Sequence, residues 1–327
     1  MINELSALRL IEEQFHGAKE CVEVGIGDDA AALKVSPGKL LLATTDCQVE
    51  DVHFLKSLIS PSDLARKSVA VSVSDIGAMG GVPKFILASL GFSGNEDEGF
   101  LKELIKGFKA SEKEFGVKLV GGNLSSSEKV FLDVTSLGEV EPGKMVRRSG
   151  AMPGDAIYVS GTLGDSALGL RLLKDGKRSD EYATLIKRHT HPGPRLSLGR
   201  KLALGGMATS MIDVSDGLLL DLERITLQQG AGARLQLDRI PVSVEYSEYV
   251  AKYTDDFYGP ALSGGEDYEL LFTSPVARRE EIRALSASLD ILITEIGEVV
   301  SDTTLAVLDS AGNEISINRR GFIHFGN

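Results

Sequence analysis

The sequence alternates between strand-type and helix-type segments from one end to the other, so each apolar helix face needs a sheet to cover it. Helices are predicted over residues 5–15, 61–80, 97–115, 165–174, 182–189, 195–204 and 218–229. Strands are predicted over residues 21–24, 31–33, 39–44, 117–120, 130–140, 156–160, 211–212, 268–273, 291–296 and 304–308. This alternation predicts a chain of the α+β and α/β classes.

A turn-rich stretch near the middle divides the sequence into two predicted domains. The 327 residues exceed what a single ordinary core holds. Residues 147–155, RRSGAMPGD, combine glycines with a proline, which is typical of a connection between domains. We therefore expect an N-terminal domain over residues 1–149 and a C-terminal domain over residues 150–327.

The composition is that of a soluble globular protein, with 43% hydrophobic and 25% charged residues. No apolar run approaches the roughly 20 residues that cross a bilayer, and acids near the start argue against a signal peptide, so we expect a cytoplasmic protein. Cys21 and Cys47 fit a reducing compartment. The formal net charge of −12 argues against a nucleic-acid partner. A protein this acidic needs positive charge to bind phosphates, and divalent metal ions supply it.

Two patterns come close to common phosphate-binding motifs but lack a required feature. GIGDDAA at residues 25–31 fits G-x-G-x-x-A, and Asp46 follows about 20 residues later. That motif requires a helix at the glycines, yet Pro37 and Gly38 follow too soon for one. Residues 138–145, GEVEPGKM, nearly match a P-loop, but Met145 stands where a hydroxyl must reach magnesium. A dinucleotide-binding motif and a P-loop are therefore both disfavoured.

Aspartates recur at the ends of apolar runs, beside hydroxyls or glycines. They are Asp28, Asp29, Asp46, Asp75, Asp213 and Asp216. Any one of them alone is more often a helix cap or a solvated turn acid. As a set they suit a hard cation, because magnesium takes oxygen ligands from carboxylates, waters and substrate phosphates. The sequence has no Cys/His cluster with zinc spacing to compete with this interpretation.

A series of motifs links these aspartates to a known family. The motifs are GIGDD (25–29), TTD (44–46) followed by VHF (52–54), SVSDIGAMGG (72–81), VGGN (120–123), RSGAMPGD (148–155), SGTLGDSALGL (160–170), IKRH (186–189) with PGPR (192–195), IDVSDGL (212–218) and SGGEDYEL (263–270). In this order they resemble the thiamine-monophosphate kinase family of the aminoimidazole ribonucleotide synthetase superfamily. One such motif is weak, but the whole series is specific.

The resemblance implies a fold, two ligands and a set of site residues. The fold is an N-terminal mixed sheet with helices, which binds ATP and magnesium and forms a homodimer, followed by a C-terminal α/β domain. The implied ligands of several Mg²⁺ ions are Asp29, Thr44, Thr45, Asp46, Asp75, Asp213 and Asp216. The implied ATP contacts are Gly122, Asn123, Arg148 and Ser215, and the implied substrate contacts are His53, Glu266 and Phe322.

Two positions depart from the family pattern. Asn123 replaces the aspartate of some members, which removes a charge and leaves a direct metal contact there open. Members often close the substrate site with a tryptophan near the C-terminus, and this sequence has none. We expect Phe322 to stack on the substrate ring instead, with Arg319 as a phosphate contact.

Simpler roles remain open for several residues. His53 can be a packed histidine between apolar neighbours, and Glu266 can be a turn acid ahead of a strand. Arg148 can pair with a carboxylate at the domain boundary. The remaining histidines are expected to be structural or on the surface; they are His16, His189, His191 and His324.

The reaction that the resemblance implies is in-line transfer of the γ-phosphoryl group of ATP to thiamine monophosphate, giving thiamine diphosphate. No general base is expected, because the acceptor oxygen belongs to a phosphate monoester that loses its second proton at about pH 6. Two alternatives remain open. One is another ATP-using synthetase of the superfamily, and the other is a magnesium or nucleotide-binding regulator that consumes no ATP.

Overall fold

The computed structural model describes residues 4–15, 21–26, 30–227, 229–254, 256–317 and 321–323. The chain forms two compact units, the first made of Met1–Gly77 and Gly81–Gly143 and the second of Ala78–Gly80 and Lys144–Asn327. The N–H of Val146 donates to the carbonyl of Met79 at 3.2 Å, and the buried Val146 side chain belongs with Ala78 to an apolar cluster of the second unit. The chain therefore joins the second unit a few residues before the turn-rich stretch.

The first unit combines helices with a four-stranded and a two-stranded sheet. Its helices are α1 (Glu4–Phe15), α2 (Pro61–Ala78) and α3 (Glu98–Phe115). Its strands are β1 (Val22–Val24), β2 (Ala32–Leu33), β3 (Leu40–Val49), β4 (Val82–Phe92), β5 (Lys118–Ser126) and β6 (Phe131–Val140). The predicted helices are confirmed, and α3 has the clearest end signals. Asp97 caps its first turn by accepting from the N–H of Phe100, and Gly116 stops it in the left-handed conformation at φ 69°.

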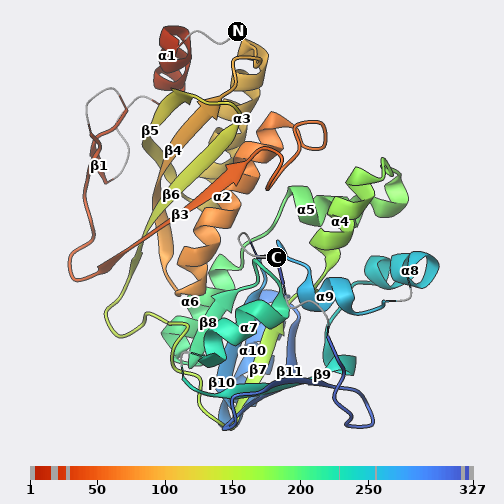
Figure 1. Cartoon of the computed structure of the whole chain (residues 1–327). Helices are drawn as coiled ribbons and strands as arrows, with labels where there is room; N and C mark the ends of the chain where they lie inside the picture. The colour runs from red at the N-terminus through yellow and green to blue at the C-terminus, as the bar shows by residue number, and fades with distance from the viewer. Residues whose placement is uncertain are drawn as a thin grey trace. The chain divides into compact units, whose positions relative to one another are not determined.

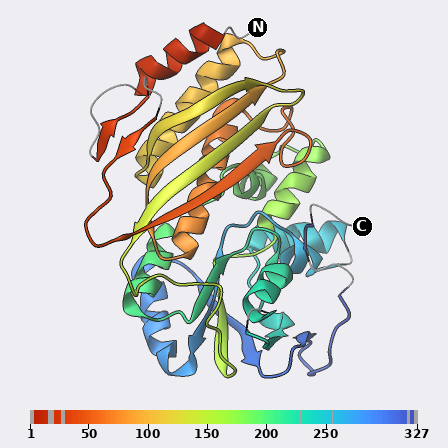
Figure 2. The ribbon, with the colours of Figure 1, turned by 60° about the vertical axis from the view of Figure 1, so that its left-hand side comes forward.

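The four-stranded sheet has the order β3-β6-β4-β5 and is antiparallel except for the pair β4 and β5. Helices α2 and α3 cover one of its faces (Figure 1), and in Figure 2 the strands face the viewer with these helices behind them. Ser72 of α2 donates its hydroxyl to Val134 O and Ser136 Oγ, both at 2.8 Å, which attaches the helix to β6. Residues of β6 that alternate with these, such as Asp133 and Thr135, lie on the opposite face.

Strand β4 is an element of the first unit that the sequence does not predict, although it lies between β5 and β6. Gly81 and Pro83 stand at its start, and both residue types weaken a strand assignment. The structure accommodates Pro83 because the register against β6 shifts between Pro83 and Phe85. Strand β4 is therefore defined by its pairing with β5 and β6, which no local pattern within β4 reveals.

The second unit contains a six-stranded sheet with helices. Its helices are α4 (Asp165–Lys174), α5 (Ala183–Thr190), α6 (Leu196–Gly205), α7 (Leu218–Leu227), α8 (Val244–Tyr253), α9 (Gly259–Ser263) and α10 (Arg279–Leu289), with single 3-10 turns at Asp180–Tyr182, Leu237–Arg239 and Val276–Arg278. Its strands are β7 (Asp155–Ser160), β8 (Ser210–Asp213), β9 (Gly232–Gln236), β10 (Leu270–Pro275), β11 (Ile293–Val300) and β12 (Leu305–Leu308). The sequence predicts α4 to α7 but not β9, α8, α9 or α10.

The strand pairing of this sheet corrects the α/β prediction for the C-terminal domain. The order is β12-β9-β11-β7-β10-β8, and every pair is antiparallel except β9 with β12. Strand β7 pairs directly with β10, with Val159 opposite Leu271, rather than with the next strand along the chain. Alternating strands and helices therefore do not imply parallel crossovers here, and the sheet is mixed and mostly antiparallel.

Both faces of the six-stranded sheet are buried by apolar side chains. Ile157 and Val159 of β7 pack in a core with helices α4, α5, α7 and α8, whereas Ala156 and Tyr158 pack in a second core with α6 and α10. This alternation follows from the two-residue period of a strand. The sheet thus holds the ends of its strands, and the loops that follow them, in fixed positions.

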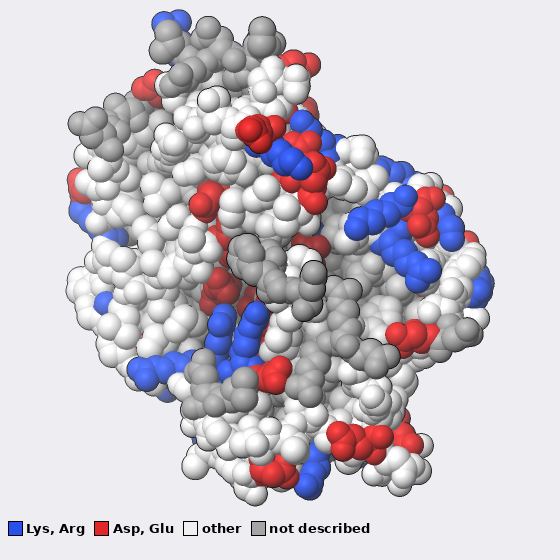
Figure 3. All heavy atoms as spheres, in the orientation of Figure 1, with Lys and Arg blue, Asp and Glu red and all other residues white. Residues whose placement is uncertain are grey.

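The surface carries charges of both signs. On the face drawn in Figure 3, acidic and basic side chains lie in small mixed groups. That face therefore has no broad basic patch. None of the helices in the described ranges is long and apolar enough to cross a membrane.

Candidate functional site

The TTD motif lies in the middle of strand β3, where it meets helix α2. The hydroxyl of Thr44 donates to Asp75 Oδ2 at 2.6 Å, so the structure brings together two predicted metal ligands that are 31 residues apart. Asp75 follows the apolar stripe of α2, which is buried against the sheet. The rigid packing of α2 therefore holds the Asp75 carboxylate beside β3.

Asp46, two residues further along β3, has an unusual carboxylate. Burial, followed by the negative charges of Asp75 and Asp133, raises the pKa of Asp46 to about 7. Its Oδ2 atom is buried and has no hydrogen-bond partner within the described part of the chain. A buried carboxylate oxygen without a donor is costly, and a cation bound there would relieve that cost.

The raised pKa of Asp46 predicts how Asp46→Asn changes stability without divalent ions. An ionised Asp46 is disfavoured in the folded chain, so the wild-type free energy of unfolding falls as the pH rises from about 4 to about 7 and then levels off. Asparagine carries no such cost. Urea unfolding with a chelator should show that Asp46→Asn is more stabilising at about pH 8 than at about pH 4. An equal effect at both pH values would contradict this.

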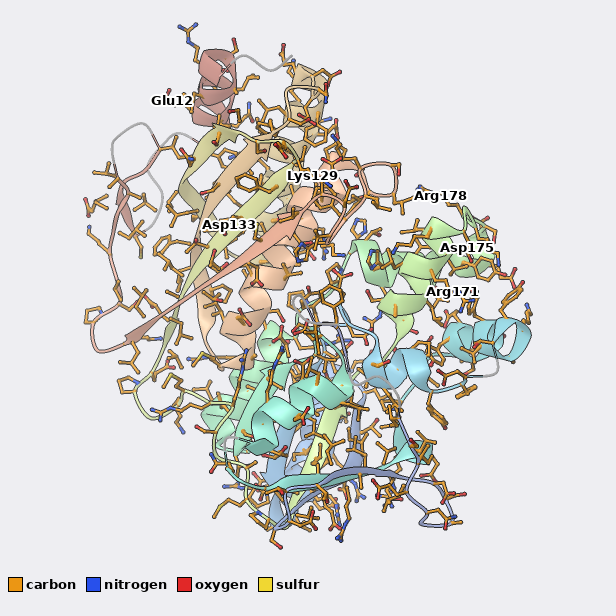
Figure 4. The ribbon with its side chains drawn as sticks, viewed as in Figure 1. Glu12, Lys129, Asp133, Arg171, Asp175 and Arg178 are labelled. Carbon is orange, nitrogen blue, oxygen red and sulfur yellow. The ribbon has the colours of Figure 1, made fainter. Side chains whose placement is uncertain are left out.

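Asp133 of β6 is an acid near the TTD motif that no sequence motif identifies. Its Oδ1 accepts from the hydroxyl of Thr45 at 2.5 Å, and Thr45 Oγ1 also lies 3.1 Å from Thr135 Oγ1. Figure 4 labels Asp133 on the sheet. The two-residue period of β6 places Asp133 on the face of the strand that points away from the core. Its proximity to Thr45, 88 residues earlier, depends on the register between β3 and β6.

The metal-ligand prediction as a whole stays a prediction. Among the described residues, no three His, Cys, Asp or Glu side chains are arranged to hold one metal ion. Asp28 and Asp29 of the GIGDD motif lie outside the described residues. Magnesium is often held by one or two carboxylates, with waters and substrate phosphates as the other ligands, so pairs of acids remain relevant.

A cavity of about 430 Å³ lies beside the predicted ATP contacts Gly122 and Asn123. Its walls include Leu8, Ile11 and Phe15 of α1, Leu101, Leu104 and Phe108 of α3, Gly25 and Ile26 at the start of the GIGDD motif, and Gly121–Asn123 of β5. The VGGN motif is thus part of β5 and not a break between strands. A Cβ on Gly122 would lie 1.9 Å from Ala88 O, so only glycine permits this close approach of β5 to β4.

In the second unit, the DVSDG segment begins at Asp213, the last residue of strand β8, and is paired with the GGEDYE segment. The N–H of Glu266 donates to Ser215 O at 2.8 Å, and the N–H of Tyr268 donates to Val214 O at 2.9 Å. The N–H of Phe322 donates to Asp216 O at 2.9 Å. The structure therefore brings together Ser215, Asp216, Glu266 and Phe322, which come from three separate parts of the chain.

Glu266 is held in a strained conformation next to a buried histidine. Its φ is 68°, and Tyr268 two residues later has φ 51°, both in the left-handed region that costs energy for these residues. Glu266 Oε2 lies 3.3 Å from His189 Nδ1, which is also 3.1 Å from Ser166 Oγ. His189 is buried, in agreement with a structural role, and it helps to fix the Glu266 side chain.

The other predicted contacts differ in how firmly they are held. His53 is half-buried, and its Nδ1 accepts from the N–H of Val49 at 3.1 Å within a tight turn after β3. Arg148 is exposed in the segment before β7, and Phe322 is 37% exposed. Arg319 lies outside the described residues. The roles of all of these residues stay predictions.

Comparisons with known proteins agree with this arrangement of motifs. The family model "AIR synthase related protein, N-terminal domain" matches residues 27–140, and the C-terminal domain model of the same family matches residues 152–310. The chain is 36% identical to thiamine-monophosphate kinase from Escherichia coli (strain K12), over 98% of each chain. It is 35% identical to thiamine-monophosphate kinase from Bacillus subtilis (strain 168), over 93% of this chain and 94% of that one.

Two solved structures are similar over nearly the whole length. Thiamine-monophosphate kinase from Stenotrophomonas maltophilia K279a has a TM-score of 0.82 and 33% identity, covering 93% of this chain and 95% of that chain. The structure of AaThiL complexed with AMPPCP and TMP has a TM-score of 0.80 and 34% identity, covering 98% and 97%. Since both sequence and structure match from end to end, the chain belongs to the thiamine-monophosphate kinase family of AIR synthase related proteins.

Proposed function

We propose that the chain transfers the γ-phosphoryl group of ATP to thiamine monophosphate, giving thiamine diphosphate and ADP. The observation that carries this proposal is the end-to-end match to thiamine-monophosphate kinases, which includes 98% of the chain and of the Escherichia coli relative. A relative of similar length binds AMPPCP and TMP together. AMPPCP is an ATP analogue, so both reactants of the proposed reaction have counterparts in that complex.

The cavity between α1, α3 and β5 supports ATP as the phosphoryl donor. Its apolar walls suit a flat heterocyclic base, and the glycine backbone of β5 at its edge allows a ligand to approach closely. Asn123 at the same edge presents an amide that can hydrogen-bond a phosphate or ribose oxygen without adding negative charge. We assign the nucleotide to this cavity.

The acidic side chains around β3 support several magnesium ions. The donor set of hydroxyls and carboxylates is the oxygen chemistry that Mg²⁺ prefers, and the buried Oδ2 of Asp46 lacks a hydrogen-bond partner. In the proposed site Asp46 and Asp75 hold Mg²⁺ with Thr44 beside them, whereas the Thr45 hydroxyl meets Asp133 on the opposite face of the sheet. Asp213 and Asp216 serve the same purpose in the second unit. Bound Mg²⁺ would neutralise the charge of the phosphate oxygens.

The residues of the chain orient the reactants and need not remove a proton. The acceptor oxygen belongs to a phosphate monoester whose second proton leaves at about pH 6, so it is already ionised at neutral pH. In-line phosphoryl transfer then depends on position and charge. Glu266, fixed by His189, would face the substrate together with Phe322, and Ser215 would contact the nucleotide phosphates.

His53 is expected to act on the substrate side of the reaction. His53→Ala should raise the KM for thiamine monophosphate by roughly tenfold, because a lost hydrogen bond to a bound ligand costs about 1–2 kcal/mol, while ATP affinity stays unchanged. Steady-state kinetics with each substrate varied in turn would measure this. Unchanged kinetics would mean that His53 only packs in the turn after β3.

Phosphorus NMR of the protein with ATP, magnesium and thiamine monophosphate tests the proposed reaction directly. Diphosphate signals of thiamine diphosphate should appear together with those of ADP. Free phosphate without a new diphosphate would point to another acceptor, and thus to a different synthetase of the superfamily. Unchanged ATP would point to a regulator that binds the nucleotide without reaction.

A second copy of the chain is the proposed partner. The face of the four-stranded sheet away from α2 and α3 carries half-exposed residues, and Leu41 on the edge strand β3 is 49% exposed. Apolar side chains on an edge strand favour association with another strand. Light scattering after gel filtration should therefore give the mass of a homodimer, and a monomer would contradict the proposal.

A further inference from the structure

Asp221 is a fully buried aspartate that lies in the first turn of helix α7, directly after the DVSDG segment. Its Oδ2 atom accepts hydrogen bonds from three consecutive backbone N–H groups. These are Ser215 at 2.9 Å, Asp216 at 3.0 Å and Gly217 at 3.2 Å. One carboxylate oxygen thus fixes the backbone of the segment that carries Asp213, Ser215 and Asp216.

The second oxygen of Asp221 extends this contact to a side chain of the same segment. Arg224 Nη1 donates to Asp221 Oδ1 at 2.6 Å, and Arg224 Nη2 donates to Asp216 Oδ2 at 2.5 Å. Hydrogen bonds between charged partners are stronger than neutral ones, and arginine holds its donors in a rigid plane. Asp221 therefore fixes the Asp216 backbone directly and the Asp216 carboxylate through Arg224.

These contacts also decide what the N-terminus of α7 can bind. Free N–H groups at the start of a helix ordinarily attract phosphate. Here the carboxylate of Asp221 already takes the amides of Ser215, Asp216 and Gly217, so a phosphate has no access to them. The segment can therefore act on an anionic reactant through its side chains and the ions they hold, and not through these amides.

We propose that Asp221 is a positioning residue, which holds the Asp213–Asp216 segment in the conformation that binds a divalent cation. This inference rests on the proposed function of Asp213 and Asp216. It assigns Asp221 no contact with the substrate or the cation. Partners that orient metal ligands typically change metal affinity by about 10- to 100-fold when they are replaced.

The test measures the binding of Mn²⁺ to the whole chain by electron paramagnetic resonance, in the absence of nucleotide. Asp221→Asn keeps the shape of the side chain but removes its charge, so the amides and Arg224 lose their strong acceptor. The Mn²⁺ affinity of the proposed site at Asp213 and Asp216 should fall by about tenfold. The Mg²⁺ concentration that gives half-maximal activity should rise in parallel. Wild-type Mn²⁺ affinity in a folded Asp221→Asn variant would overturn the proposal.

Two matched variants separate this proposal from the proposed function. Asp216→Asn should also weaken Mn²⁺ binding, because it alters a proposed ligand. If Asp216→Asn weakens binding and Asp221→Asn does not, the positioning role is wrong while the metal role stands. If neither variant changes Mn²⁺ binding, the positioning role of Asp221 and the metal role of Asp216 are both wrong. Asp238→Asn, an exposed acid in the same unit, serves as the control and should leave binding unchanged.

Hydrogen exchange provides a second measurement that does not need metal or activity. In Asp221→Asn the amides of residues 215–217 should exchange faster, while peptides from β7 and β10 keep their wild-type rates. Should that variant fail to fold, Arg224→Gln removes the partner of Asp221 Oδ1 at a side chain that is 37% exposed. It should also speed exchange at residues 215–217, and unchanged exchange there would overturn the proposal.

Discussion

Asp75→Asn is expected to lower the rate of thiamine diphosphate formation by roughly 100-fold or more while the chain stays folded. Asp75 lies on the rigid helix α2, and its Oδ2 accepts from the hydroxyl of Thr44 at 2.6 Å. An amide in its place has one oxygen instead of two and no charge. It would therefore bind a proposed Mg²⁺ poorly and leave the charge of the two anionic reactants less well neutralised.

Steady-state kinetics at saturating ATP and thiamine monophosphate would measure this loss. Asp63→Asn is the matched control, because Asp63 lies in the first turn of the same helix, about 18 Å along the helix axis from Asp75. It should keep nearly full activity. Circular dichroism would establish that both variants are folded. Near-normal turnover in folded Asp75→Asn would exclude Asp75 as a metal ligand.

Glu269→Ala is expected to lower the free energy of unfolding of the second unit by about 3–5 kcal/mol, since it breaks a buried ionic network. The Glu269 side chain is fully buried. It accepts from Arg195 Nε at 2.5 Å, Arg195 Nη2 at 2.6 Å, Arg188 Nη2 at 2.8 Å and Ser160 Oγ at 2.6 Å. Alanine would leave two mostly buried guanidinium groups without this partner, as well as a cavity.

Chemical unfolding of the wild type and the variant would measure the difference. Glu281→Ala is the control, because Glu281 forms an exposed ion pair with Arg278 at 2.7 Å, and its loss should cost at most about 1 kcal/mol. Glu269→Gln should fall between the two, because it keeps the shape and some hydrogen bonds. If Glu269→Ala destabilised the chain no more than Glu281→Ala, the network would not be a source of stability.

Helices with clear end signals were predictable, and the order of strands was not. The Asp97 cap, the apolar stripe and Gly116 define α3 within the segment itself. Strand β4 lacks such signals, because its hydrogen bonds go to β5 and β6. The same reason explains the C-terminal sheet, in which β7 pairs with β10 across more than a hundred residues. Strand partners depend on distant segments, whereas helix hydrogen bonds are local.

The candidate site shows the same division at the level of single residues. The motifs pointed to Thr44, Asp46 and Asp75, and the structure shows the hydrogen bond between Thr44 and Asp75. Asp133 and Asp221 were not identified, although Asp133 accepts from Thr45 and Asp221 from three backbone amides. An aspartate inside a strand or helix looks like a surface residue in the sequence. Only the neighbours that folding brings to it reveal its role.

By itself, the sequence determined the family of this protein, its two domains and the positions of its acidic, glycine-rich motifs, because these depend on residue type and order along the chain. Only the tertiary structure decided the pairing of the strands, the cavity beside Gly122 and the way Ser215, Asp216, Glu266 and Phe322 meet. Those features depend on contacts between residues far apart in the sequence. Such contacts form only when the burial of apolar side chains and the pairing of backbone groups have selected one arrangement of the whole chain.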